Sequence, residues 1–197
     1  MISRTGVGGA IAAAVIVAGL SGGPRAASVI APAFDAMVAR AQVVFVGETL
    51  DVRSRWESTP SGRAIVSVVT FKVIRTLKGE LGGQTQLEFL GGTVGDYRME
   101  IPGMPRFRVG DEDVLFVDER GQPVSPVVGF MHGRFRVLED PGTRRRSMAR
   151  YNFEPLASVR DIGAATPAPR ISAARALTLA AFEDEIAREV RRQREAR

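Results

Sequence analysis

Between residues 42 and 140 the chain alternates apolar and polar residues in runs separated by glycine and proline turns, and this pattern constrains the fold most. Two long runs come first, "VVFVGETLDVRSRW" and "AIVSVVTFKVIRTLKG", and shorter runs follow at intervals of 8–15 residues. A period of two is typical of half-buried β-strands. The pattern predicts a mainly β fold of about six to seven antiparallel strands. Gly47, inside the first long strand, predicts a bulge or bend, which favours a small β-barrel over a flat sandwich.

Helical periodicity is confined to the two flanks of this β region. Phe34, Met37 and Val38 predict a short N-terminal helix at about 33–40. The C-terminal segment predicts an amphipathic helix at about 179–194, because Thr178 is a good N-cap, acidic residues come early and arginines come late. Its apolar stripe consists of Leu179, Phe182, Ile186 and Val190.

The first 33 residues have the layout of a secretory signal peptide. Arg4 gives a short basic region, residues 6–20 are uncharged and apolar, and small residues follow with Ala27 and Ala33 as alternative cleavage sites. The apolar run is shorter than the about 20 residues of a transmembrane helix. We therefore expect an exported protein, periplasmic or secreted, with no integral membrane span after cleavage at about 27–33.

The expected domain organisation follows from these segments. It comprises a signal peptide (1–33), a β-barrel domain (34–140), an irregular linker (141–177) and a C-terminal helix (178–197). Residues 34–140 carry 13 basic and 15 acidic residues, whereas residues 141–197 carry 12 and 7. The basic residues are nearly all arginine, which points to compositional bias, so we expect no nucleic-acid partner.

Cysteine and histidine usage excludes several kinds of site. The chain has no cysteine and one histidine, His132. Disulfide staples, cysteine-based metal sites and multi-histidine zinc sites are therefore ruled out. His132 lies between Gly129 and Gly133 without a nucleophile elbow elsewhere, so we expect no catalytic residues and no enzyme.

The stretch "LEFLGGTVGDYRMEIPGMPRFRVGDEDVLFV" (87–117) contains the most distinctive motifs. Its glycines lie between two expected strands, not between a strand and a helix, so it is not a phosphate-binding loop. Two metal sites compete with simpler roles for the same residues: calcium at the acidic residues of 111–119, and copper at Met99, Met104, Met131 and His132. We favour the simpler roles: the acidic residues are solvated at the strand ends, and the methionines pack in the core. We therefore expect no metal or cofactor.

An interaction patch is the favoured site. The loop between Gly91 and Pro105 and the turn Met131–Gly133 are expected at one end of the barrel. There they would present residues of the kinds that protein interfaces prefer: Tyr97, Met104, Pro105, Phe107 and His132. Packing of strand ends is the competing interpretation of the same residues.

Residues 36–118 also resemble a known superfamily. The segments "VVFVGE", "F.V.R.LKG" and "F.VGDEDVLFV" are similar to bacterial exported domains related to tissue inhibitors of metalloproteases and netrin-like modules. The resemblance implies an OB-like barrel and a protein partner, with a secreted metalloprotease favoured. Those inhibitors chelate the protease zinc through an N-terminal cysteine, which this chain lacks, so none of their inhibitory residues carries over.

The sequence thus predicts an exported, non-enzymatic β-barrel module that binds another protein. The alternative is a periplasmic carrier that binds a small ligand or a metal.

Overall fold

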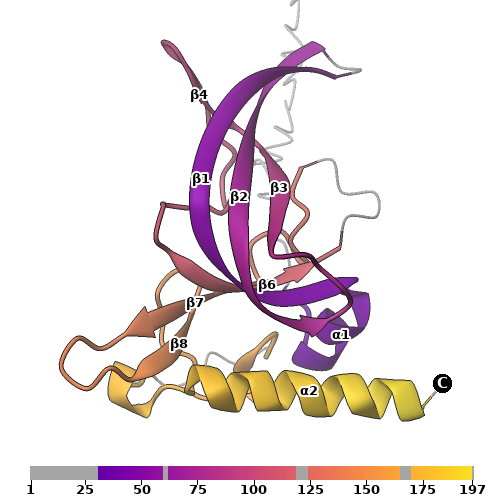
Figure 1. The fold of residues 1–197 in the computed structure, drawn as a ribbon, viewed down its shortest axis with the longest axis vertical. Helices are drawn as coiled ribbons and strands as arrows, with labels where there is room; N and C mark the ends of the chain where they lie inside the picture. Colours follow the sequence, from indigo (N-terminus) through magenta and orange to yellow (C-terminus); the bar gives the residue numbers. More distant parts are fainter. Residues whose placement is uncertain (1–30, 60–61, 119–123, 165–169, 197) are drawn as a thin grey trace, which may run out of the picture.

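A computed structural model describes residues 31–59, 62–118, 124–164 and 170–196. The predicted signal peptide therefore lies almost wholly outside the described residues and stays a prediction. The elements along the chain are α1 (Phe34–Arg40), β1 (Val43–Thr59), β2 (Gly62–Lys78), β3 (Gln84–Leu90), β4 (Gly92–Val94), β5 (Tyr97–Met99), β6 (Glu112–Val117), β7 (Arg134–Glu139), β8 (Arg146–Arg150), the 3-10 turns Val159–Asp161 and Ala173–Arg175, and α2 (Leu179–Glu195) (Figure 1).

Six strands form one antiparallel sheet in the order β3-β2-β1-β6-β7-β8, and β4 and β5 pair as a separate small ribbon. The mainly β fold with two flanking helices is confirmed. The pairings of the described residues do not close a barrel, because the sheet ends at β3 on one side and at β8 on the other.

The first two strands form a long, strongly bent hairpin that rises from the rest of the molecule (Figure 1). Each strand has 17 residues, and their register shifts at Val44/Phe45, Val46/Gly47 and Thr49/Asp51. Such bulges bend a strand locally. A Cβ on Gly47 would lie 2.6 Å from Cε2 of Phe45. The glycine at the predicted bend therefore also leaves room for the Phe45 ring.

The sheet buries residues on both faces. Val44 and Val46 of β1 belong to one hydrophobic core, whereas Phe45 between them belongs to a second core on the opposite face. This follows from the alternation of side chains along a strand. Phe116 and Leu115 of β6 divide between the two cores in the same way.

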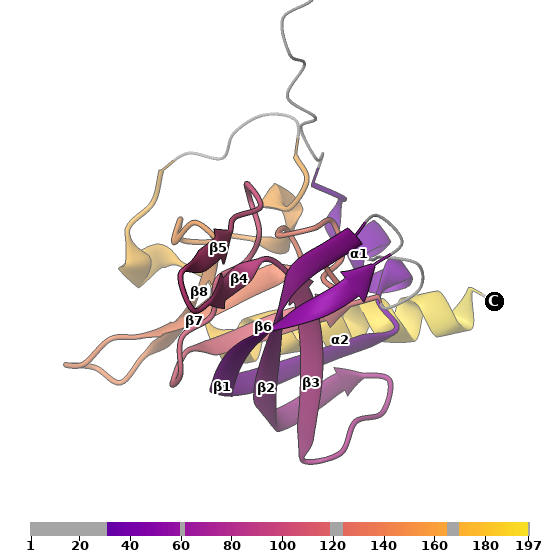
Figure 2. The same ribbon diagram turned by 90° about the horizontal axis from the view of Figure 1, so that it is seen from above.

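Helices α1 and α2 cover the face of the first core (Figures 1 and 2). Phe182 of α2 packs against Phe116 and Phe135, with ring centroids 6.2 and 5.1 Å apart, and the whole predicted stripe of α2 is buried. The hydroxyl of Thr178 accepts a hydrogen bond from Ala181 N at 3.2 Å, as the N-cap prediction requires. Within the described chain, neither helix has the length and apolar character of a membrane span.

The segment 141–177, expected as an irregular linker, adds to the sheet. Residues Arg146–Arg150 form β8, which pairs with β7, so the sheet extends past residue 140. Leu156 and Ile162 are buried in the first core. The strand has only five residues, too few for a period to stand out. It is formed because the turn at Asp140, whose carboxylate accepts from Thr143 N at 2.7 Å, returns the chain alongside β7.

Candidate interaction groove beside the second core

A groove of about 300 Å³ extends the second core outward. Its floor comes from β1, β2 and β3, and its walls come from the segments on either side of the β4–β5 ribbon. The lining residues are Val52, Ser54, Ser67, Val69, Phe89–Thr93, Arg98–Ile101 and Met104–Phe107. Phe89, Val69, Phe107 and Met104 also belong to the second core or pack against it, so the groove is continuous with a well-packed base.

The pairing of β1 with β2 builds the floor. Val52 lies opposite Val69, and Ser54 lies opposite Ser67, so two valines and two serines share one face. The serine hydroxyls are 3.0 Å apart, and Ser67 donates to Gly91 O at 2.7 Å. These hydroxyls are occupied in holding the chain that enters the ribbon, so the groove offers an incoming group mainly apolar surface.

Gly92 makes this close approach possible. Its φ is +140°, and a Cβ at this position would lie 2.4 Å from the hydroxyl oxygens of both Ser54 and Ser67. A larger residue would be strained at this φ and would have to displace both hydroxyls or the ribbon itself. The "GG" pair of the sequence therefore serves to lay the ribbon against the sheet.

Charged residues form one rim of the groove. Glu100 pairs with Arg98 and with Arg106, the latter at 2.5 Å. The hydrogen bond and charge of Arg98, helped by Arg106, lower the pKa of Glu100. All three side chains are exposed, so the cluster shapes the rim while contributing little to stability.

Arg134 of β7 fixes the wall from beneath. Its guanidinium donates to both carboxylate oxygens of Asp113, at 2.9 and 2.8 Å, and to the carbonyl of Arg106 at 2.5 Å. It also lies 4.0 Å from the ring centre of Phe107. Arg134 and Asp113 are both buried. Burial raises the pKa of Asp113, and the charge and hydrogen bonds of Arg134 oppose that rise.

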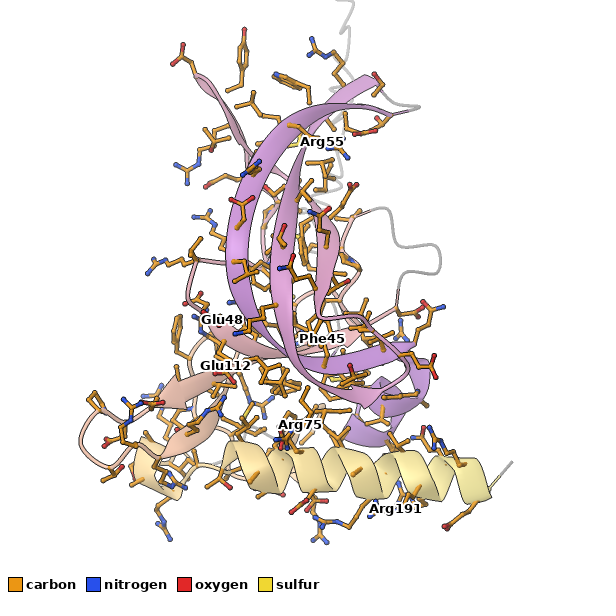
Figure 3. The ribbon with its side chains drawn as sticks, in the orientation of Figure 1. Phe45, Glu48, Arg55, Arg75, Glu112 and Arg191 are labelled. Atoms are coloured by element: carbon orange, nitrogen blue, oxygen red, sulfur yellow. The ribbon has the colours of Figure 1, made fainter. Side chains whose placement is uncertain are left out.

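A partly exposed cluster of Trp56, Tyr97 and Arg63, which we call the hairpin tip, lies next to the groove. Trp56 of β1 meets Tyr97 of β5 edge to face at 5.5 Å, and the guanidinium of Arg63 lies 4.6 Å from the Trp56 ring centre. Tyr97 is 67% exposed. The label of Arg55, the neighbour of Trp56 in the chain, marks this distal part of the hairpin in Figure 3.

The structure distributes the five predicted patch residues over three places. Met104, Pro105 and Phe107 line the groove, and Phe107 is largely buried there. Tyr97 belongs to the adjacent hairpin tip. His132 is half-buried, and its ring meets Tyr151 edge to face at 5.5 Å, outside the groove lining.

The expected proximity of the Gly91–Pro105 loop to the Met131–Gly133 turn is seen at Gly103. A Cβ on Gly103 would lie 2.8 Å from Cε of Met131, so the proline-broken loop does pack on the 130–133 turn.

Trp56 and Arg63 were missed as site residues. The hairpin register could have identified Trp56. Antiparallel pairing of the two long strands sets Trp56 opposite Ile65 and Ser54 opposite Ser67. That register puts Trp56 on the same face as Val52 and Ser54. What the sequence does not contain is the position of the ribbon that brings Tyr97 to Trp56.

Three of the acidic residues that offered a calcium site, Asp111, Glu112 and Asp113, pair with arginines, and Glu119 lies outside the described residues. Asp113 pairs with Arg134, and Asp111 lies 2.8 Å from Arg136. Glu112, labelled in Figure 3, pairs with Arg146. In the portion of the chain that the structure describes, no three histidine, aspartate or glutamate residues are grouped as a metal site.

Comparison of the chain with protein-family models, curated proteins and solved structures finds no match. We therefore infer the function from the chemistry of the groove and the hairpin tip.

Proposed function

We propose that this protein is an exported, non-enzymatic module that binds another protein through the groove and the hairpin tip. The observation that carries the proposal is an apolar groove beside the half-buried Trp56 and the exposed Tyr97 and Arg63. Tryptophan, tyrosine and arginine are the residues that dominate the binding energy of protein interfaces. A well-packed base beneath them gives the rigid support that such residues need.

The volume of the groove favours a protein partner over a carrier function. Small-molecule sites usually enclose about 300–1,000 Å³, so this groove lies at the lower limit of that range. The groove can accept one or two apolar side chains of a partner, while the hairpin tip contacts the neighbouring surface of that partner. The alternative is a periplasmic carrier of a small ligand or a metal, for which the thioethers of Met99 and Met104 in the lining are the supporting feature.

The partner class and the fold family are parts of the same proposal. The resemblance to tissue inhibitors of metalloproteases supports a secreted metalloprotease as partner and an OB-like barrel as the parent architecture. The bent β1–β2 hairpin and the antiparallel sheet are compatible with a barrel opened between β3 and β8. Because the chain has no cysteine, binding would use the groove and the tip, not an N-terminal chelating group.

Affinity capture from the secreted fraction, followed by titration of the captured protein, tests the proposal. We expect Trp56→Ala to weaken binding at least about tenfold, since truncation of an interface hot spot costs more than about 1.4 kcal/mol. Ile74→Ala is the control, because Ile74 is apolar and 45% exposed but belongs neither to the groove lining nor to the hairpin tip.

Equal losses in the two variants would contradict the proposed surface. If no partner is captured and calorimetry instead gives heat with an acyl ligand, calcium or copper, the carrier alternative replaces the proposal.

A further inference from the structure

We propose that the partner enters the groove with an apolar side chain flanked by carboxylate groups, as in an acidic peptide segment. This inference rests on the proposed function, because it names the partner's chemistry at the same groove and hairpin tip. The observation behind it is the distribution of charge over the β1–β2 hairpin and the β4–β5 ribbon. The groove side carries an excess of arginine, whereas the opposite face of the hairpin, the far face, is neutralised by its own ion pairs.

The charged residues near the distal end of the far face pair with one another. Arg53 lies 2.8 Å from Asp51. Arg55 pairs with Glu57 and, at 2.7 Å, with Glu88 of β3. These residues of β1 alternate with the residues that form the groove floor, so they point away from it. This part of the far face therefore offers no preference for a partner of either charge.

Arg63 lies on the groove side of the hairpin. It is two residues before Ile65, which pairs with Trp56, so the three side chains share one face. Its guanidinium lies 4.6 Å from the Trp56 ring centre. Among the residues that the structure describes, Arg63 has no acidic partner. A guanidinium that lies over an aromatic ring keeps its edge N–H groups available, so Arg63 can donate to a carboxylate while it contacts Trp56.

Arg98 and Arg106 supply a second positive position at the rim. Both donate through Nη2 to the same oxygen of Glu100, Oε1, so the two guanidiniums converge on one point that is suited to a carboxylate. Their side chains are 63% and 72% exposed, and each guanidinium keeps further N–H donors. A carboxylate of a partner can therefore bind at this point while Glu100 stays in place.

The charge balance and the apolar floor together define the partner's chemistry. Three arginines, Arg63, Arg98 and Arg106, outnumber the acids beside the groove, even when the exposed Asp96 in the β4–β5 turn is counted with Glu100. The floor between these charges is apolar. Complementary charge at an interface contributes mainly to specificity and to the rate of association. The groove should accordingly select apolar segments that carry acidic neighbours.

Three capped peptides that differ only in charge test the inference. They are acetyl-Gly-Glu-Leu-Leu-Glu-Gly-amide and the versions with glutamine or lysine in place of both glutamates. The chain has one tryptophan, Trp56, so its fluorescence in the purified protein reports binding without a label. We expect the acidic peptide to bind about tenfold more tightly than the glutamine peptide, because each exposed ion pair contributes roughly threefold in affinity. The lysine peptide should bind most weakly, and the preference should shrink between about 50 and 500 mM NaCl.

Variants of single residues separate charge from apolar contact. Arg63→Gln should weaken the acidic peptide about threefold and leave the glutamine peptide unchanged, whereas Arg63→Lys should keep most of the preference because it keeps the charge. Arg53→Gln is the matched control, since Arg53 is 83% exposed on the far face, and it should change neither affinity. Tyr97→Ala should weaken all three peptides. A loss for Arg63→Gln that is equal for the acidic and glutamine peptides would contradict a role in carboxylate binding.

The other outcomes distinguish this inference from the proposed function. Equal affinities for the acidic and glutamine peptides, both reduced by Tyr97→Ala, would overturn the inference and leave the groove as a protein-binding site. No binding of any peptide at about 1 mM would overturn both. Tighter binding of octanoate, a carboxylate on an apolar chain, would also overturn both and support the carrier alternative. A dimer that sedimentation detects and Arg63→Gln abolishes would assign the groove to a second copy of the chain and overturn the inference.

Discussion

Replacing Arg134 by methionine tests how the groove wall is held. The variant loses two hydrogen bonds to Asp113, one to the carbonyl of Arg106 and the contact with the Phe107 ring. It also leaves the Asp113 carboxylate buried without its main counter-charge. Breaking a buried ion pair from one side costs about 3–5 kcal/mol. With a urea dependence of about 2 kcal/mol per molar, the unfolding midpoint should fall by about 2 M.

The pH dependence of this loss gives the sharper test. Burial already raises the pKa of Asp113, and without Arg134 the pKa should rise further. A carboxyl whose pKa is raised by folding binds its proton more tightly in the folded state. Its contribution is therefore most favourable below the unfolded pKa of about 3.9 and is lost as the pH rises through the folded pKa.

The destabilisation by Arg134→Met should accordingly be larger at pH 7.5 than at pH 4.5, as measured by urea unfolding at both values. Adding Asp113→Asn should remove that difference, since position 113 then carries no titrating carboxyl group. Arg53→Met is the matched control, because Arg53 pairs with Asp51 at 2.8 Å but is 83% exposed, and its cost should stay below about 0.5 kcal/mol. A loss for Arg134→Met below about 1 kcal/mol, or one that is equal at the two pH values, would refute the reasoning.

Three other variants probe different parts of the fold. Phe182→Ala should lower the free energy of unfolding by about 3–5 kcal/mol and expose the first core, measured by urea unfolding and dye binding, because Phe182 is fully buried. Thr178→Ala should cost about 1 kcal/mol by the same measurement through loss of the α2 N-cap, whereas Thr178→Ser should restore most of it. Gly92→Ala should displace the ribbon from the hairpin and weaken partner binding, with a loss of the close Trp56–Tyr97 contact seen by tryptophan fluorescence; an unchanged spectrum would contradict this.

Much of the fold could be predicted because it depends on local pattern. The period-two runs predicted β1, β2 and β7, the bend at Gly47 followed from a glycine inside a long strand, and the stripe from Leu179 to Val190 predicted α2. Strand β8 was missed because five residues with an arginine at each end carry no periodic signal of their own. Strand β8 forms because each of its residues pairs with a residue of β7.

The candidate site, like the fold, could be predicted only in part from the sequence. Met104, Pro105 and Phe107 could be selected because they are apolar residues in and directly after a proline-broken loop, and they do line the groove. His132 could not be placed, because its ring orientation depends on Tyr151, which is 19 positions later in the chain.

The sequence by itself determined the β-rich composition of the fold, its two flanking helices and the absence of cysteine chemistry, since each depends on residue type and short-range spacing. Only the tertiary structure decided which faces meet. It laid the ribbon on the hairpin through Gly92, brought Tyr97 to Trp56 and placed the buried Arg134–Asp113 pair beneath the wall. These contacts join residues about 20 to 40 positions apart, and such contacts depend on strand register and close packing, which local periodicity does not encode.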